Sequence, residues 1–426
     1  MNTNKNQNKG FHNKSKGIGM LYDDIFLVNG ARTPFGKLCG TLGQVSPTDL
    51  GIFASKGALK NSQIKGSDID QVVFANIGQS SADSYFLPRH IGLFSEIPEG
   101  VPAIMVQRIC GSGFETIITG AEQITLGKAQ VTLSGGTENM TLSPTVSFGN
   151  RMGYPLGKID FKDMLWEALN DTAAVPMGCT AENVAIKHKI TKEDTNQFAK
   201  ESIDKYIAAK ERGFFDDEII KMNSTVFEIE GLTPRKVYLP KKTVDFNTDE
   251  NVRPTDLEIL GKLPSVFARD GVQTAGNSSG IVDGAASVIV ADGNYIRNNG
   301  LRPLTKIVAS STSALDPRVM GLGPVPAIQL LLEMTGLSMS EIGLIEINEA
   351  FAAQFIGCER ELGLNRDICN VNGGAIALGH PLAATGARIS LTLSREMNAR
   401  KVKYGIASAC IGGGQGTAIL FENCNL

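Results

Sequence analysis

The sequence predicts an α/β protein that consists of two duplicated α/β halves, with a loop domain inserted into the first half. From Asp24 onward, short apolar segments alternate with amphipathic segments, which is the pattern of strands joined by helices. The alternation breaks between about residues 141 and 262 and then resumes for a second round that ends at Phe421. With 426 residues, of which 42% are hydrophobic, the chain is long enough for two such halves with large buried cores.

The first half is predicted to be a sheet of short buried strands with helices between them. Apolar residues recur at three- and four-residue intervals from Phe114 to Ile124, which indicates a helix with one buried face. Short, continuously apolar runs are typical of strands covered on both faces, so we expect a mostly parallel sheet. The expected strands cover residues 25–28, 72–75, 103–106, 131–134 and, after the insertion, 288–290, and the expected helices cover 49–59 and 114–124.

The inserted segment carries apolar positions throughout, so we expect a loop domain and not a linker. Thr191 with Asp194 three residues later predicts a helix start, and Gly213 predicts the end of that helix. We expect residues 1–22 to form a disordered tail, residues 23–290 the first half including the insertion, and residues 291–426 the second half.

The second half repeats the alternation of the first. The expected strands cover residues 305–309, 344–347, 404–408 and 418–421, and the expected helices pass through 328–332 and 355–362. Each half contains a strand that enters a cysteine–glycine turn, one at Cys110 and the other at Cys410. We therefore interpret the chain as a domain duplication in which these two turns are equivalent.

Composition and charge exclude several classes of protein. The net charge is −3 without an extended basic run, so we expect no nucleic-acid binding. No apolar stretch has the length of a membrane span, which predicts a soluble protein. The seven cysteines form no Cys-x-x-Cys pair and the four histidines lack paired ligand spacing. We therefore expect a reducing compartment, no disulfide framework and no metal site.

Residues 1–20 are dominated by Asn, Lys and Gly. They lack the apolar segment of a secretory signal and the arginines of a transit peptide. We therefore expect a cytoplasmic protein, with the mitochondrial matrix as the alternative.

Three reactive side chains lie in glycine-rich segments. The segments are Cys-Gly-Ser-Gly at 110–113, Gly-His-Pro at 379–381 and Cys-Ile-Gly-Gly-Gly-Gln-Gly at 410–416. Glycine lets the backbone approach a ligand closely, a feature that a merely structural cysteine or histidine does not need. A thiol nucleophile, an imidazole base and a second thiol are the groups required for thioester chemistry without a metal or prosthetic group.

The local context of these groups suggests how each is tuned. Cys110 precedes the one-faced helix, so the helix N-terminus is predicted to lower the pKa of its thiol toward neutrality. Tight turns around His380 are expected to leave its ring exposed in a cavity, as a neutral proton acceptor. The glycine run after Cys410 lacks the Lys and Ser/Thr of a phosphate-binding loop.

Together with Gly-Gly-Thr-Glu-Asn-Met at 135–140 and Asn-Glu-Ala-Phe-Ala at 348–352, these segments resemble the motifs of the thiolases, acyl-CoA acetyltransferases of the condensing-enzyme superfamily. The resemblance covers about residues 24–421. Around Cys110 and Trp166 the chain is more similar to 3-ketoacyl-CoA thiolases of fatty-acid breakdown than to dedicated acetoacetyl-CoA enzymes. The resemblance implies a layered α-β-α-β-α fold and a homodimer or homotetramer.

The resemblance also implies a role for each reactive group. Cys110 would be the nucleophile that becomes acylated, His380 would activate its thiol, and Cys410 would be the acid/base at the α-carbon. Asn348 would hold a water that, with His380, stabilises the thioester oxyanion. The N–H groups of Cys110 and Gly412 would form a second oxyanion hole.

The resemblance implicates four residues in the binding of coenzyme A, which is a substrate and not a bound cofactor: Met177, Ala275, Ser279 and Phe351. The chain departs from the acetoacetyl-CoA enzymes at two places. Pro176 stands where they commonly have a His, and Val282 replaces a common Asn. These departures leave the reactive groups intact and the acyl-chain preference open.

The predicted reaction is the reversible, CoA-dependent thiolysis of 3-ketoacyl-CoA, including acetoacetyl-CoA, to acyl-CoA and acetyl-CoA by a ping-pong acyl-cysteine mechanism in fatty-acid β-oxidation. One alternative is a biosynthetic acetoacetyl-CoA thiolase. A decarboxylating ketoacyl synthase of the same fold would need His or Asn at position 410. A non-catalytic acyl-CoA-binding relative would be expected to lack at least one of the three reactive groups.

Overall fold

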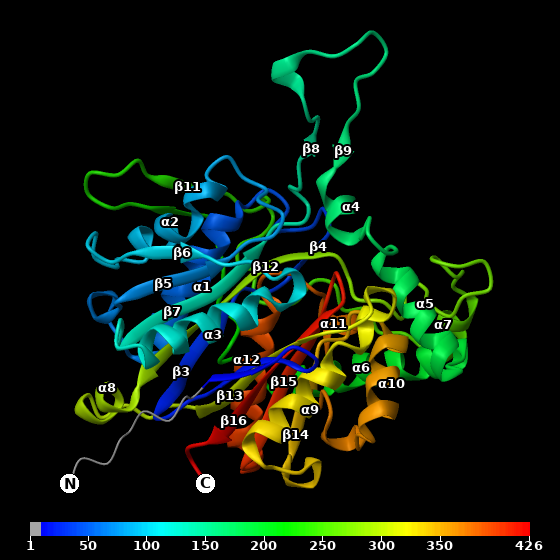
Figure 1. Cartoon of the computed structure of the whole chain (residues 1–426). Coiled ribbons are helices and arrows are strands. Elements are labelled where there is room, and N and C mark those ends of the chain that lie inside the picture. The colour runs from blue at the N-terminus through cyan, green and yellow to red at the C-terminus, as the bar shows by residue number, and fades with distance from the viewer. Residues whose placement is uncertain (1–9) are drawn as a thin grey trace.

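The structure is a computed structural model that describes residues 10–426. The first half contains the predicted alternation of strands and helices (Figure 1). Its elements are β3 (Ile25–Arg32), β4 (Gly36–Lys37), α1 (Pro47–Ser62), β5 (Gln71–Ala75), α2 (Leu87–Phe94), β6 (Ala103–Met105), α3 (Ser112–Thr125), β7 (Val131–Glu138), β12 (Val282–Asp292) and α8 (Gly293–Asn298).

The second half follows the same rhythm. Its elements are β13 (Thr305–Ala314), α9 (Pro324–Thr335), β14 (Leu344–Ile347), α10 (Ala352–Leu362), α11 (Ala375–Leu378), α12 (Thr385–Arg400), β15 (Tyr404–Ile411) and β16 (Gln415–Asn423). The strands of both halves follow the order β14-β15-β16-β13-β3-β12-β7-β5-β6. The order divides into two parts, because β13 and β3 share only the pairs Thr305–Leu27 and Lys306–Phe26.

Helices α3 and α12 pack against each other between the two parts of the sheet, whereas α1 and α9 cover the outer faces (Figure 1). Alternate residues of β12 illustrate this burial. Val288 and Val290 belong to the core around α3 and α12, and Ile289 and Ala291 belong to the core beneath α1. Successive strand residues point to opposite faces, so β12 is buried on both sides. The layers are therefore α-β-α-β-α, and the predicted fold class is confirmed.

The expectation of a mostly parallel sheet is wrong. Parallel pairing occurs in β5–β6, β5–β7 and β14–β15, but β12 is antiparallel to both β3 and β7, and β16 is antiparallel to both β13 and β15. The apolar runs reflect cover by helices on both faces, which the layers supply to antiparallel strands as well. The short turn at 412–414 also forces β15 and β16 to run in opposite directions.

The two halves repeat each other element by element. The order β3-β12-β7-β5 in the first half corresponds to β13-β16-β15-β14 in the second, and α3 corresponds to α12. Cys110, before α3, therefore matches the His380 segment before α12, and Cys410 in β15 matches the end of β7. The predicted equivalence of the Cys110 and Cys410 turns is wrong, because one glycine turn leads into a helix and the other into a hairpin.

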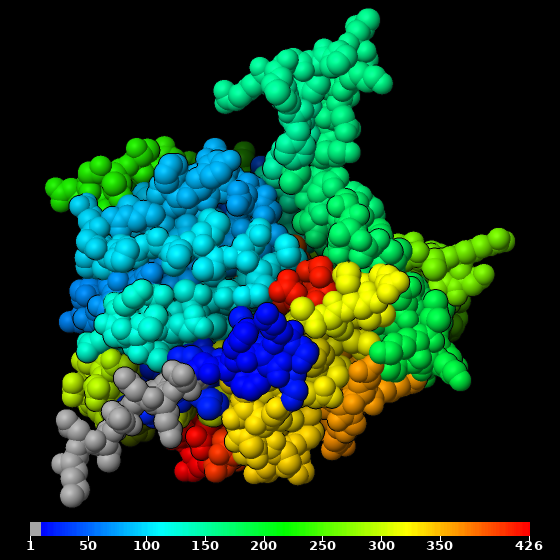
Figure 2. All heavy atoms as spheres, in the orientation of Figure 1, coloured from blue at the N-terminus to red at the C-terminus, as the bar shows by residue number. Residues whose placement is uncertain are grey.

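Between β7 and β12 the chain leaves the sheet for residues 139–281, a longer segment than the predicted 141–262. Helix α6 begins at the capping box of Thr191 and Asp194 and is followed by Gly213 at φ +73°, as predicted. The ribbon of β8 and β9 projects away from the body of the molecule (Figures 1 and 2). The elements of this segment are β8 (Thr145–Val146), β9 (Lys162–Asp163), α4 (Met164–Leu169), α5 (Met177–His188), α6 (Lys192–Glu211), β10 (Thr225–Phe227), β11 (Arg235–Val237) and α7 (Leu257–Lys262).

Residues 10–21 form a hairpin of β1 (Gly10–Asn13) and β2 (Gly17–Leu21), so the prediction of a disordered tail is wrong for them. The rest of that predicted tail, residues 1–9, lies outside the described residues. Strand β2 pairs with residues 309–312 of β13, and Lys16 forms an ion pair with Glu333 of α9. In Figure 2 the hairpin (dark blue) lies between α3 and the second half. The edge of β13 supplies backbone partners for this hairpin.

We expect removal of residues 1–21 to lower the midpoint of thermal unfolding by about 2–5 °C, because the deletion leaves the edge of β13 unpaired. Differential scanning calorimetry measures this shift. Lys16→Ala is the control, since an exposed ion pair contributes at most about 1 kcal/mol. Equal midpoints for the truncated and full-length chains would contradict a stabilising role.

No helix within residues 10–426 combines the length and the apolar character needed to cross a bilayer.

Candidate active site

Cys110 lies where β6 leads into α3, on a backbone that takes an unusual conformation. Ile109 has φ +42°, a left-handed value that is strained for a β-branched residue and is typical of functional turns. A side chain on Gly111 would collide with Ile411 of β15, and one on Gly113 would collide with the start of α12. The two glycines therefore allow Cys110 to lie close to both other glycine-rich segments.

Cys110 is buried, with 7% of the residue exposed. Burial raises its pKa to about 11, an effect that the N–H groups of Gly412 and of Cys110 itself partly offset. The predicted lowering of this pKa is therefore wrong for the resting site, because loss of solvation outweighs the donors at the helix start. The contact with Gly412 is nevertheless the geometry expected of a site where two backbone N–H groups converge beside a sulfur atom.

His380 is buried, at 6% exposure, and not exposed as predicted. Its Nδ1 lies 2.6 Å from the hydroxyl of Thr385, which donates its own proton to the carbonyl of Pro381 (3.1 Å). Nδ1–H must therefore donate to Thr385, which leaves Nε2 as an acceptor. Asn348 Nδ2 donates to Nε2 over 3.3 Å. Burial, with a contribution from Arg388, lowers the pKa of His380 to about 3, so the ring is neutral.

The amide of Asn348 is 1% exposed. Its Oδ1 accepts no hydrogen bond from any protein group within residues 10–426. A buried acceptor of this kind is costly unless a ligand or solvent satisfies it. The free acceptor lies beside the proton-accepting nitrogen of His380.

Cys410 lies near the end of β15 and is fully buried. Burial raises the pKa of its thiol well above the usual value, and the nearby thiol of Cys110 raises it further. Cys410 packs in one cluster with Met320 and Ala350, against which Met177 and Phe351 also pack. The structure thus brings the two thiols together, as the sequence predicts, and places two of the predicted CoA-binding residues beside them.

The segment 277–280 connects the predicted CoA-binding residues to His380. The N–H of Ser279 donates to the carbonyl of Ala350 (3.0 Å), one residue before Phe351. The N–H of His380 donates to the carbonyl of Gly280, also over 3.0 Å. Ala275 lines a neighbouring cavity of about 380 Å³ together with Arg253 and Ser278. Arg253, which sequence reasoning missed, presents an exposed cation there.

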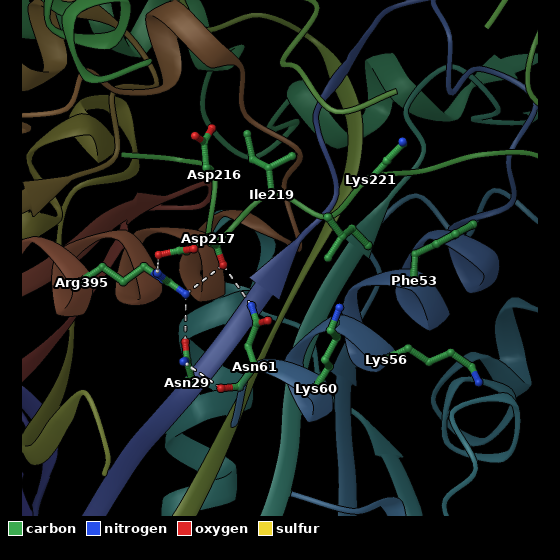
Figure 3. Close-up of a pocket in the computed structure, with 12 residues that line it drawn as sticks. Asn29, Phe53, Lys56, Lys60, Asn61, Asp216, Asp217, Ile219, Lys221 and Arg395 are labelled. Carbon is green, nitrogen blue, oxygen red and sulfur yellow. Dashed lines mark hydrogen bonds and ion pairs between the residues drawn. The ribbon is translucent and has the colours of Figure 1, made fainter. Parts of the chain in front are cut away.

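A larger cavity of about 670 Å³ lies elsewhere, between α1, residues 216–221 and α12 (Figure 3). No predicted site residue lines it. Figure 3 shows that the ammonium groups of its lysines, Lys56, Lys60 and Lys221, point to different sides. Lys56 and Lys221 pair with acidic residues. This cavity therefore does not belong to the thiol–imidazole cluster.

Sequence reasoning also missed residues that complete the cluster. Thr385, which orients His380, is a common residue at a helix start and carries no signal of its own. Leu165 and Ala168 of α4 pack in the cluster that contains Cys110, although α4 belongs to the projecting insertion. Glu138 lies within the quoted motif at 135–140, but only its contacts reveal a role.

Val282, which replaces a common Asn, packs directly against Gly379, where a side chain would collide with it. Pro176 is the residue before α5, so that Met177 begins the helix. In the described part of the chain, no group of three or more His, Cys, Asp or Glu side chains is arranged to hold a metal ion.

Comparison with known proteins agrees with this geometry. Residues 25–294 match the family model of the thiolase N-terminal domain, and residues 301–423 match that of the thiolase C-terminal domain. The mitochondrial 3-ketoacyl-CoA thiolase of Bos taurus is 43% identical over 406 residues, which cover 95% of this chain and 99% of that protein. An acetyl-CoA acetyltransferase of Allochromatium vinosum is 38% identical over 413 residues, which cover 94% and 100% of the two chains.

Solved structures extend the likeness to three dimensions. The crystal structure of human mitochondrial 3-ketoacyl-CoA thiolase in complex with CoA matches with a TM-score of 0.88 and 43% identity, over 94% of this chain and 98% of the other. An acetyl-CoA acetyltransferase of Bacillus anthracis matches with a TM-score of 0.87 and 35% identity, over 95% and 99%. Both family models match, and these relatives align with nearly the whole chain. The chain therefore belongs to the thiolase family of acyltransferases.

Proposed function

We propose that this thiolase catalyses the reversible, CoA-dependent cleavage of 3-ketoacyl-CoA, including acetoacetyl-CoA, to acyl-CoA and acetyl-CoA. One observation carries the proposal: the Cys110 thiol meets the N–H of Gly412 beside a second thiol, Cys410. Acyl transfer needs the first thiol and the backbone donors, whereas proton transfer at carbon needs the second thiol.

In the first half-reaction, the Cys110 sulfur attacks the 3-keto carbonyl while His380 Nε2 takes the thiol proton. The N–H groups of Cys110 and Gly412 stabilise the oxyanion of the tetrahedral intermediate. When the bond between the α-carbon and the keto carbon breaks, the acyl group remains on Cys110. The electron pair goes to acetyl-CoA as an enolate, and Cys410 protonates its α-carbon. His380 and a water held by Asn348 stabilise the enolate oxygen.

In the second half-reaction, Cys410 takes the thiol proton of free CoA as the CoA sulfur attacks the acyl-Cys110 thioester. Acyl-CoA leaves, and His380 returns its proton to the Cys110 sulfur, which restores all three groups. The raised pKa of Cys110 and the lowered pKa of His380 keep both groups neutral at rest. The proton therefore moves only as the sulfur attacks, and no thiolate is exposed to unproductive reactions.

We propose that Met177, Ala275, Ser279 and Phe351 contact CoA. Their clustering supports this assignment, because Met177 and Phe351 pack beside Cys410 while Ala275 lines the adjoining cavity. Arg253 at the wall of that cavity is suited to a CoA phosphate. The human relative was solved in complex with CoA.

We favour a degradative role in fatty-acid β-oxidation, with a biosynthetic acetoacetyl-CoA thiolase as the alternative. The relatives include both 3-ketoacyl-CoA thiolases and acetyl-CoA acetyltransferases. Thiolysis rates measured on 3-ketoacyl-CoA substrates of increasing chain length test this choice. Comparable kcat/KM for long and short chains is the result expected of a degradative enzyme. Activity on acetoacetyl-CoA alone favours the alternative. The proposed reaction is contradicted if none of the substrates is cleaved.

We place the protein in the cytoplasm, with the mitochondrial matrix as the alternative. The alternative rests on several relatives that are named as mitochondrial enzymes. Fractionation of cells that express the full chain distinguishes the two.

We propose a homodimer or homotetramer, and the projecting ribbon supports assembly through its apolar tip. The tip exposes large apolar side chains to an extent that is unusual on a monomer: Phe148, Met152, Leu156, Ile159 and Phe161. We expect replacement of residues 148–161 by a short Gly-Ser linker to reduce the mass measured by light scattering by at least one subunit. An unchanged mass would exclude the tip from the interface.

We expect Thr385→Val to slow acetylation of Cys110 about 10- to 100-fold, because the variant removes the acceptor that fixes Nδ1–H and keeps Nε2 as the proton-accepting nitrogen. Stopped-flow measurement of acyl-enzyme formation tests this expectation. Thr385→Ser keeps the hydroxyl and is the matched control. Equal rates for the valine and serine variants would show that the hydroxyl does not orient the ring.

A further inference from the structure

Glu138 at the end of β7 is a buried carboxylate that collects hydrogen bonds from two loops. Its Oε1 accepts from Asn76 Nδ2 (2.9 Å) and the N–H of Gly78 (2.8 Å). Its Oε2 accepts from the N–H groups of Ile77 (3.2 Å) and Ala383 (3.1 Å). The side chain is 1% exposed. Four donors face its two oxygens, so an ionised carboxylate satisfies this site better than a protonated acid does.

Ala383 is also held at its carbonyl. A side chain on Gly136 of β7 would overlap the carbonyl oxygen of Ala383, and one on Gly113 of α3 would also collide with it. The first half of the chain therefore fixes both the N–H and the carbonyl of this one residue, and so the two peptide groups on either side of its α-carbon. Such close contact leaves little freedom for the turn that contains it.

The turn that contains Ala383 also carries the proposed catalytic base. His380 begins it, Thr385 ends it, and Leu382 packs in the cluster of Cys110. The two catalytic groups come from different halves of the chain, so their spacing depends on contacts between the halves. The hydrogen bond from Ala383 to Glu138 is such a contact, and Glu138 also acts electrostatically on Cys110.

We propose that the ionised carboxylate of Glu138 is a positioning residue, which holds the His380 turn at its working distance from Cys110. The inference rests on the proposed function, because it concerns the same thiol and imidazole. A displacement of about 1 Å between reacting groups costs roughly 100-fold in rate, so loss of this contact lowers the acylation rate without removing a group that touches substrate.

The proposal predicts a dependence on pH, because the strength of this contact depends on the protonation state of Glu138. Burial raises the pKa of Glu138 to about 7; the N–H groups of Gly78, Ile77 and Ala383 lower it, and Asp283 of β12 raises it. Asp283, whose own pKa is raised by burial to about 6, and Cys110 are ionisable groups that interact with it. Below about pH 7 a proton occupies an oxygen that faces N–H donors. The hydrogen bond from Ala383 to Glu138 therefore weakens as the pH falls, and the acylation rate falls with it.

Glu138→Gln tests this inference, because its amide mimics the protonated acid at every pH. We expect acetylation of Cys110 by acetyl-CoA to be about 10- to 100-fold slower than wild type at pH 8, with KM for acetyl-CoA unchanged. Between pH 6 and 8 the wild-type rate should rise with a midpoint near 7, whereas the variant rate should stay flat. The matched control is Asp70→Asn, since Asp70 accepts the N–H groups of Gln130 and Val131 at the opposite end of β7.

The outcomes separate the positioning role from the proposed function. Equal rates and equal pH profiles for Glu138→Gln and Asp70→Asn would overturn the role of Glu138 alone. A wild-type enzyme that forms no acetyl-Cys110 would overturn the proposed function and this inference with it. If Glu138→Gln does not fold, the wild-type profile decides, because a rate that is flat from pH 6 to 8 excludes a need for the ionised carboxylate.

Discussion

Cys110→Ser should abolish the acyl-enzyme and lower thiolysis by roughly 10³-fold or more. The serine hydroxyl occupies the same place beside the N–H of Gly412, but it is a far weaker acid and nucleophile than the thiol. His380 is itself neutral, with a pKa lowered to about 3 by burial, so the less acidic serine hydroxyl transfers its proton to this ring even less readily than the thiol does. Intact-protein mass spectrometry after incubation with acetyl-CoA measures the adduct.

The control for this experiment is another buried cysteine. Cys369→Ser changes a side chain that is 1% exposed and donates to the carbonyl of Asn365, a bond that a hydroxyl can also make. We expect this variant to acquire one acetyl group as the wild type does. An adduct that persists on a residue other than Cys110 in the Cys110→Ser variant would refute the assignment of the nucleophile.

The three reactive groups could be predicted from the sequence because their signal is local. Cys110, His380 and Cys410 each lie among glycines that serve close contacts between segments, and the structure brings the two thiols together. The glycines serve close packing between segments as well as the approach of a ligand. Gly113, for example, makes room for the start of α12 and not for a ligand alone.

The errors have a common physical origin, which is that they concern partners distant in sequence. The direction of β12 depends on β3 and β7, and the folding of residues 10–21 depends on the edge of β13. The pKa of Cys110 depends on how completely other segments exclude water from it. None of these partners can be identified from the residue pattern of the segment itself.

The hydrogen bond between Glu138 and Ala383 likewise depends on a partner that is distant in sequence. Glu138 lies within a family motif, but the motif does not indicate which groups its carboxylate contacts. Its function as an acceptor for Asn76, Ile77, Gly78 and Ala383 requires the two halves to be assembled. A residue that acts between halves becomes visible only in three dimensions.

Cys410→Ser should leave acetylation of Cys110 intact but slow exchange of the α-protons of acetyl-CoA with solvent by about 10²- to 10⁴-fold, the usual contribution of a general acid–base. Burial raises the pKa of the Cys410 thiol well above its usual value, so the thiol keeps its proton until a carbanion develops beside it. A serine in the same fully buried place is a still weaker acid and cannot deliver the proton as readily.

Incubation of acetyl-CoA with the variant in D₂O, followed by NMR, measures the exchange, and the acetyl adduct on Cys110 in the same sample is the internal control. Exchange at the wild-type rate would assign the α-proton to another group. Loss of both exchange and acetylation would mean that Cys410 supports the nucleophile and does not act at carbon, because the two thiols are close enough for each to influence the other.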